Sequence, residues 1–132
     1  MTPLRALRLH PGDDLRAALT AAAGEPGGFV LSGIGSLDRT WIRLAGASHA
    51  SEFVGDLEIL TLAGSLSPDG AHLHLSVADA KGRVWGGHVA PGCTVRTTAE
   101  VLVALLPAGT LVRAPDPATG HAELVVRTRV SP

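Results

Sequence analysis

Short apolar runs bounded by glycine, proline and aspartate follow one another along most of the chain. Runs of this length between turn-forming residues are typical of β-strands. Turns are expected at 67–70 and 115–117, where proline and aspartate cluster. The pattern predicts strands at about 4–9, 29–35, 40–44, 57–66, 111–113 and 122–130.

A different period marks one helix near the N-terminus. Leu15 and Leu19 recur at the four-residue spacing of a helix face, and Gly24 is a stop signal. Asp13 is well placed to accept hydrogen bonds from the free backbone N–H groups of the first turn. We therefore expect one helix, over about 14–23.

The apolar stretch 94–106 fits either a strand or a helix, because a short apolar run does not reveal its period. The chain is predicted to form a single α+β domain over residues 1–132, with a mainly antiparallel sheet and one clear helix. Its length of 132 residues is enough for one domain to bury its own core.

The segment from 72 to 88 is predicted to be a β-hairpin. The loop 80–82, Ala-Lys-Gly, has glycine at the position that such three-residue loops keep left-handed. This loop pairs Asp79 with Arg83 and fixes the register of the two strands. A two-residue loop would slip that register by one residue and turn the side chains of one strand to the opposite face.

The predicted register gathers three histidine side chains on one face of the hairpin. It places His74 opposite His88 at a Cβ separation of about 5 Å, and His72 about 6.5 Å further along its strand. Neutral imidazole is a favoured ligand of zinc, and three histidines with one open position form a known catalytic zinc set. His72, His74 and His88 are therefore candidate ligands for zinc or another divalent transition metal. The alternative is that they are ordinary hydrogen-bonded or exposed strand residues.

The charge and composition narrow the classes of partner. The net charge is -1 and the arginines are scattered, whereas a direct reader of nucleic acid usually carries a basic stripe. Hydrophobic residues make up 45% and charged residues 17%, which leaves apolar surface beyond one core and favours an oligomer. The single cysteine, and the lack of a signal peptide or a long apolar run, indicate a cytoplasmic protein.

Other candidate residues have simpler structural interpretations. Cys93 could be a nucleophile near His88, but a buried, unreactive cysteine is the more common case. Glycines 33 and 35 lack the third glycine of a dinucleotide-binding fingerprint. Asp79 and Glu100 could carry protons at the histidine site. Alternatively, Asp79 could merely stabilise the hairpin turn, and Glu100 could pair with an arginine across a subunit contact. The remaining histidines are interpreted as surface residues: His10, His49 and His121.

The central part of the chain carries short motifs in a specific order. They are H-L-H-x-S-x-A-D at 72–79, G-x-x-x-G-G-H at 82–88, G-C-x-V at 92–95 and T-x-E at 98–100. Upstream, the segments 33–37 and 55–60, followed by Gly64, fit the same pattern. From about residue 9 to 126 the chain resembles the plant-and-prokaryote conserved (PPC) domain family.

This resemblance implies a compact PPC-like fold with a central, strongly bent antiparallel sheet, assembled as a homotrimer. Plant members carry AT-hooks and use the domain for assembly and partner contacts, and stand-alone prokaryotic members are labelled DNA-binding proteins. This chain has no AT-hook, and Asp56 stands where plant members usually place arginine. Both departures argue against direct DNA binding.

Two functions remain open from the sequence. The first is a trimeric binding or regulatory module, linked to transcription or DNA binding but acting through protein partners. The alternative is a metal-binding protein or a metal-dependent enzyme that uses His72, His74 and His88. Metal binding requires deprotonated imidazoles, so the affinity is expected to fall below about pH 6.5, the ordinary histidine pKa.

Overall fold

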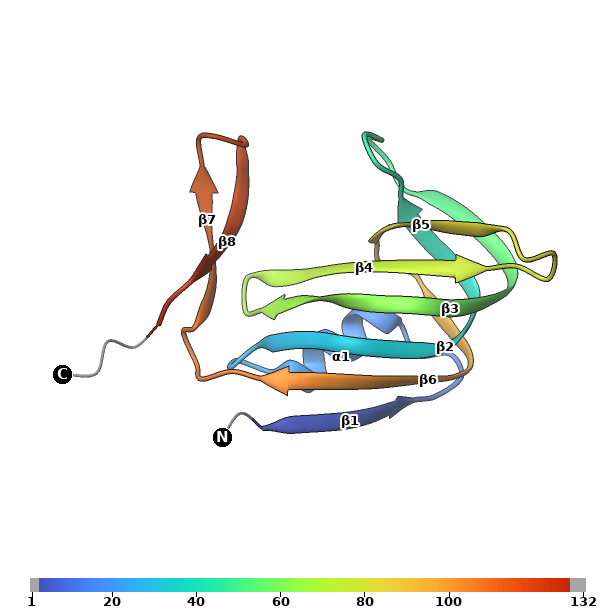
Figure 1. The fold of residues 1–132 in the computed structure, drawn as a ribbon, viewed down its shortest axis with the longest axis horizontal. Coiled ribbons are helices and arrows are strands. Elements are labelled where there is room, and N and C mark those ends of the chain that lie inside the picture. Colours follow the sequence, from blue (N-terminus) through green and yellow to red (C-terminus); the bar gives the residue numbers. More distant parts are fainter. Residues whose placement is uncertain (1–2, 129–132) are drawn as a thin grey trace.

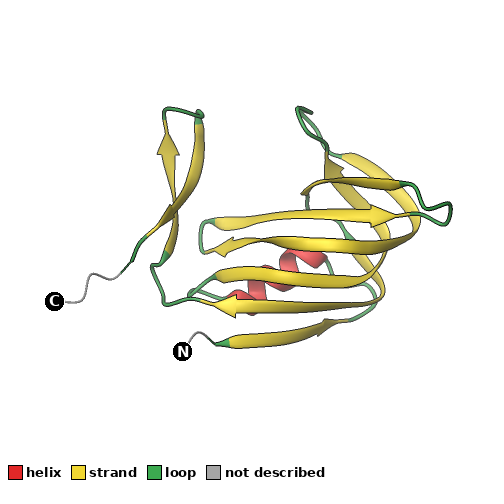
Figure 2. Cartoon of the chain, viewed as in Figure 1, coloured by secondary structure: helices red, strands yellow, loops and turns green. Residues whose placement is uncertain are grey.

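The computed structural model describes residues 3–128, which form eight strands and one helix (Figures 1 and 2). The predicted α+β class, with a mainly antiparallel sheet and one helix, is confirmed. The elements are β1 (Leu4–Leu9), α1 (Leu15–Ala23), β2 (Gly28–Arg43), β3 (Ser51–Ser67), β4 (Gly70–Ala78), β5 (Val84–Val89), β6 (Thr94–Leu105), β7 (Leu111–Asp116) and β8 (His121–Val126).

Helix α1 begins one residue later than predicted, and the capping residue is Asp14 instead of Asp13. The Asp14 carboxylate accepts hydrogen bonds from the backbone N–H groups of Ala17 at 2.9 Å and Gly92 at 2.7 Å. Asp13 accepts one from the His10 N–H instead, at 2.8 Å. The cap is the residue directly before the first helical turn, and two adjacent aspartates made that position ambiguous in the sequence.

The strands predicted at 29–35 and 40–44 are one continuous strand, β2, so the break predicted between them is wrong. The intervening residues pair with β3 and β6 and contain a register shift between Leu37 and Arg39, as a β-bulge produces. Ser36 is buried there, and its hydroxyl hydrogen-bonds the Thr97 hydroxyl at 2.6 Å. A polar residue inside the sheet is tolerated because its hydroxyl has a partner on the neighbouring strand.

The main sheet has the strand order β1-β6-β2-β3-β4-β5, and every pair is antiparallel. The end of β2 also pairs with β5, where Ile42 faces Val89 and Arg43 faces His88. The long strands therefore curl until β5, at one edge of the sheet, pairs with the end of β2. This gives the strongly bent sheet expected of a PPC-like fold (Figure 1). The ambiguous stretch 94–106 is a strand, β6.

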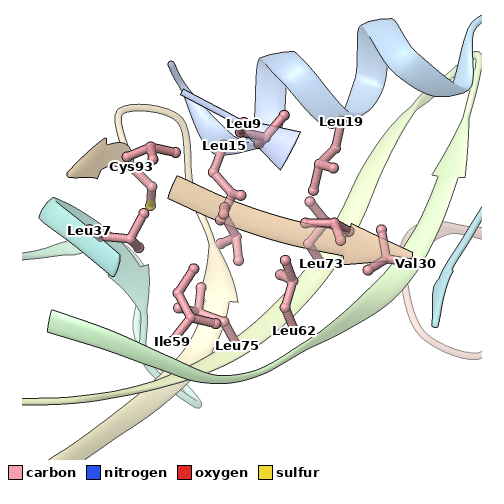
Figure 3. Packing of buried hydrophobic residues seen from close by; sticks show 14 of the residues in the cluster. Leu9, Leu15, Leu19, Val30, Leu37, Ile59, Leu62, Leu73, Leu75 and Cys93 are labelled. Carbon is pink, nitrogen blue, oxygen red and sulfur yellow. The ribbon is translucent and has the colours of Figure 1, made fainter. Parts of the chain in front are cut away.

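The core lies between the concave face of the sheet and α1. Leu15 and Leu19 of the helix are fully buried against Leu62, Leu73 and other sheet residues (Figure 3). Burying each leucine side chain stabilises the fold by about 2 kcal/mol before entropy is counted. The core fixes which face of β4 points inward, and so which face is left for the histidines.

Strands β7 and β8 pair only with each other and form a second, two-stranded sheet (Figure 1). Arg113 of β7 hydrogen-bonds Ser65 of β3 and the Asp69 carboxylate, so this hairpin contacts the main sheet. The turn predicted at 115–117 lies later, because Pro115 pairs with Ala122 inside the hairpin and the chain reverses after Asp116. The strand predicted at 122–130 is β8, which ends at Val126. Residues 129 and 130 of the predicted range lie outside the described part of the chain. No helix among residues 3–128 is long and apolar enough to cross a membrane.

Candidate metal centre

The loop between β4 and β5 adopts the predicted three-residue geometry. Gly82 has a φ of 76°, a left-handed conformation that other residues adopt at a cost. The Asp79 N–H donates to the Arg83 carbonyl at 3.0 Å, and the Asp79 carboxylate accepts from the backbone N–H groups of Lys81 and Arg83 at 2.9 Å each. The carboxylate also pairs with the Arg83 side chain at 2.8 Å. Asp79 therefore stabilises the turn, which is one of the two roles considered for it.

The register predicted from this loop is confirmed. His74 pairs with His88, Leu75 with Gly87 and Val77 with Trp85. A one-residue slip would have separated the histidines, and it does not occur.

The three imidazole rings converge on one face of the hairpin. The ring centroids of His72 and His74 are 4.9 Å apart, those of His72 and His88 are 4.9 Å apart, and those of His74 and His88 are 5.5 Å apart. One nitrogen from each ring lies within 4.8 Å of the other two. On the opposite face of β4, Leu73 and Leu75 are buried in the core. The strand alternation therefore separates a structural face from a polar one.

The distance between two of these nitrogens fits a metal ion. The Nε2 atoms of His72 and His74 face each other at 3.2 Å. A tetrahedral zinc ion bound to both at about 2.0–2.1 Å would hold them about 3.3 Å apart. Two unprotonated Nε2 atoms at this distance would repel each other through their lone pairs. Either a proton or a metal cation must therefore lie between them. His72 and His74 therefore fit a zinc ion, and His88, with a nitrogen within 4.8 Å of both, lies where it could supply a third imidazole and leave one position open.

The surroundings of His72 and His88 disfavour protonation of these two imidazoles. Burial lowers the pKa of His88 to about 4, with further contributions from the positive charges of His72 and Arg43. Burial also lowers the pKa of His72, assisted by His74 and Arg113. Neutral imidazole is the form that binds metals, so these environments favour the ligand state.

A cavity of about 770 Å³ opens beside His72 and His88. Its walls come from segments that are distant in sequence, and they carry several charged side chains. The charged and titratable lining residues are Arg16, Arg43, Asp69, His72, His88, Arg113, His121 and Glu123. His121 is exposed, as expected, and borders the cavity. The sequence does not single out the arginines, since no local motif marks residues that meet only through the fold.

The other candidate residues do not join the three histidines. Cys93 is fully buried, and burial raises the pKa of its thiol to about 11, so the interpretation as an inert core cysteine holds. Glu100 lies exposed on β6, where it pairs with Arg8 of β1 and Ile34 of β2 in the strand register. His10 and His49 are exposed, as expected.

Comparison with known proteins finds close relatives. The chain is 50% identical over 124 residues to a segment of a Synechococcus protein named bifunctional protein GlmU; the match covers 92% of this chain and 20% of that protein. The chain thus spans about a fifth of the length of the curated relatives it matches.

Two solved structures share the fold over nearly the whole chain. A hypothetical protein from Salmonella is 37% identical, with a TM-score of 0.92 and coverage of 98% of this chain and 96% of that one. A protein from Archaeoglobus fulgidus described as metal-containing is 26% identical, with a TM-score of 0.77 and coverage of 93% of each chain. The model of the Plants and Prokaryotes Conserved (PCC) domain matches residues 4–107, so the chain belongs to this family, the one its histidine and glycine motifs resemble.

Proposed function

We propose that this protein is a metal-loaded binding module in which His72, His74 and His88 hold a divalent transition metal, with zinc the best fit. The observation that carries the proposal is the convergence of three imidazole nitrogens within 4.8 Å of one another on one face of the β4–β5 hairpin. When bound, the ion would supply a Lewis-acidic position open to a fourth ligand. The 26% identical relative from Archaeoglobus fulgidus, described as metal-containing, supports the proposal.

Binding suits this site better than catalysis. The Asp79 carboxylate, one candidate proton carrier, is engaged by three donors of the hairpin loop. The other candidate, Glu100, lies on β6, which is separated from β4 by β2 and β3 in the sheet. We infer that the module acts through protein partners. The Synechococcus relatives support this inference, because there the matching segment is joined to a much longer chain.

Removing the central ligand should abolish metal binding. His74 pairs with His88 and faces His72, so His74→Ala leaves two imidazoles. The loss of a ligand should weaken zinc binding by more than about a hundredfold, beyond the effect of losing a residue that only orients a ligand. His49→Ala removes an exposed histidine outside the cluster and should leave the zinc affinity unchanged. Titration calorimetry and elemental analysis of protein purified without a histidine tag would measure both. Unchanged zinc binding in His74→Ala, or no zinc binding in the wild-type protein, would contradict the proposal.

The metal-free protein should lose stability as the pH falls from about 6.5 towards 4. Unfolded histidine takes up a proton near pH 6.5, whereas the folded state holds the pKa of His88 down to about 4 and also lowers that of His72. The unfolded state therefore binds more protons in this range, and the free energy of unfolding decreases as the pH falls. For the same reason, protons should compete with metal at His88 only well below pH 6.5.

Urea unfolding in the presence of a chelator would measure this pH dependence. His88→Gln should reduce its slope by up to about 1.4 kcal/mol per pH unit, the contribution of one proton. The exposed control His49→Gln should leave the slope unchanged. An equal slope in His88→Gln and wild type would show that His88 is not held neutral by the fold.

An apolar surface supports the proposal that the chain assembles as a homotrimer. Helix α1 covers one face of the sheet (Figure 1). Large apolar side chains of the central strands remain exposed to solvent. Leu31, Ile34 and Leu60 are 51%, 55% and 49% exposed. Half-buried Leu102 of β6 is paired with Ser32 and lines the same shallow hollow as Ile34. A surface of this kind on a charge-poor chain is typical of a subunit interface.

Light scattering coupled to size exclusion should report about three times the chain mass of 13.5 kDa. Leu102→Glu places a charge in the proposed interface and should shift the mass towards that of the monomer. Leu102→Met, which keeps an apolar side chain of similar volume, should remain trimeric. A wild-type chain that stays monomeric at high concentration would contradict the assembly.

Direct DNA binding should be weak and unspecific. Several outer arginines are paired with acids, including Arg96 with Asp56 at 2.8 Å and Arg39 with Glu52 at 3.8 Å. With a net charge of -1, the dissociation constant should be no tighter than about 10⁻⁶ M at physiological salt. Fluorescence anisotropy with duplexes of several sequences would measure it. Nanomolar, sequence-selective binding would overturn this expectation.

A further inference from the structure

Three arginines from three different elements line the cavity beside the histidines. Arg16 comes from α1, Arg43 from the end of β2 and Arg113 from β7. Two of these arginines, Arg43 and Arg113, lie next to the candidate ligands. Arg43 is the register partner of His88, and the Arg113 side chain donates to the hydroxyl of Ser65, the register partner of His72. The cations therefore flank the cluster from two sides.

These three guanidinium groups form no ion pairs with the described residues. Among residues 3–128, no carboxylate lies within 4.0 Å of the side-chain nitrogens of Arg16, Arg43 or Arg113. Arg16 makes one long contact with the Val89 carbonyl at 3.4 Å, and Arg113 makes the single contact with Ser65 at 3.0 Å. Most of their N–H donors are left for another acceptor.

The cavity wall carries an excess of positive charge. Against the three arginines stand two carboxylates, Asp69 and Glu123, and Asp69 already accepts the backbone N–H of Arg113 at 2.8 Å. A divalent ion on the histidines would add two more positive charges. Such a concentration of unpaired cations in a concave site is unfavourable unless an anion occupies it.

We propose that this cavity binds the phosphoryl group of a small molecule, with one oxygen at the open position of the metal ion and the others on Arg16, Arg43 and Arg113. The proposal rests on the proposed metal function, because the ion supplies one of the contacts. The volume of about 770 Å³ is that of a small-molecule site and leaves room for the rest of the ligand.

The arrangement of donors favours a phosphoryl group over a carboxylate. A carboxylate carries one charge on two oxygens, and a single arginine satisfies it in a bidentate pair. A phosphoryl group carries up to two charges on three oxygens that point in different directions. Guanidinium groups arriving from a helix, a strand end and a separate hairpin, together with an ion, suit that shape better.

Inorganic phosphate and acetate serve as probes of the two chemistries. Each would be titrated by calorimetry into wild-type protein loaded with one equivalent of zinc, and into the metal-free protein. Phosphate should bind to the zinc-loaded protein at least tenfold more tightly than acetate does. Loading with cobalt should add a change in the visible spectrum when phosphate reaches the ion. Equal or tighter binding of acetate would overturn the assignment to a phosphoryl group.

Arg43→Gln tests the arginine contribution, since the Arg43 side chain makes no hydrogen bond or ion pair with any described residue. It should weaken phosphate binding about tenfold or more while leaving one equivalent of zinc bound. Arg39→Gln, on the same strand but paired with Glu52 outside the cavity, should change neither.

The two proposals fail in different ways. If zinc binds but phosphate does not saturate the site at millimolar concentration, or binds equally well to Arg43→Gln and wild type, the phosphoryl proposal is wrong and the metal site stands. If zinc does not bind the three histidines, the proposed function is wrong. In that case the titration of metal-free protein still tests the arginines: if they bind phosphate, Arg43→Gln should bind it more weakly than wild type.

Discussion

The register of the β4–β5 hairpin is the constraint on which the candidate site depends. It is fixed at the loop, where Gly82 supplies a left-handed residue and the Asp79 carboxylate accepts both backbone and side-chain donors. Because side chains alternate between the faces of a strand, this one register sends Leu73 and Leu75 into the core and the histidines to the other face. Core and site therefore specify the same pairing, and neither could shift without the other.

The closure of β5 onto β2 turns the hairpin face into a cavity wall. It requires a close approach of two backbones at Gly87, where an added Cβ would lie 2.7 Å from the carbonyl oxygen of Arg43. Gly87 also has a φ of 159°, at the edge of the range that disfavours side chains. A glycine here lets β5 pair on both edges, so that Arg43 lies beside His88. The G-G-H motif thus has a structural cause next to its candidate ligand.

Local rules in the sequence predicted the parts of the structure that depend on local interactions. The hairpin register followed from one loop, and the helix followed from the spacing of Leu15 and Leu19. The continuity of β2 was missed, because Ser36 and Asp38 resemble a turn. Ser36 becomes a strand residue only when Thr97 supplies a hydroxyl partner from a strand 61 positions away. Sequence periodicity carries no information about such a partner.

The cavity was likewise beyond local rules, since Arg16, Arg43 and Arg113 are brought together only when the helix, the curled sheet and the β7–β8 hairpin are all in place. Their position also gives the site its electrostatic character. Burial, and after it nearby positive charge, lowers the pKa of His72 and His88, and the same positive charge opposes a divalent cation. Three neutral ligands do not offset the charge of such an ion, whereas an anion bound between it and the arginines does. Metal and anion would then raise each other's affinity by the same factor, as linkage requires. The charges of the arginines and of the metal ion are thus balanced only when the metal and the anion are both bound.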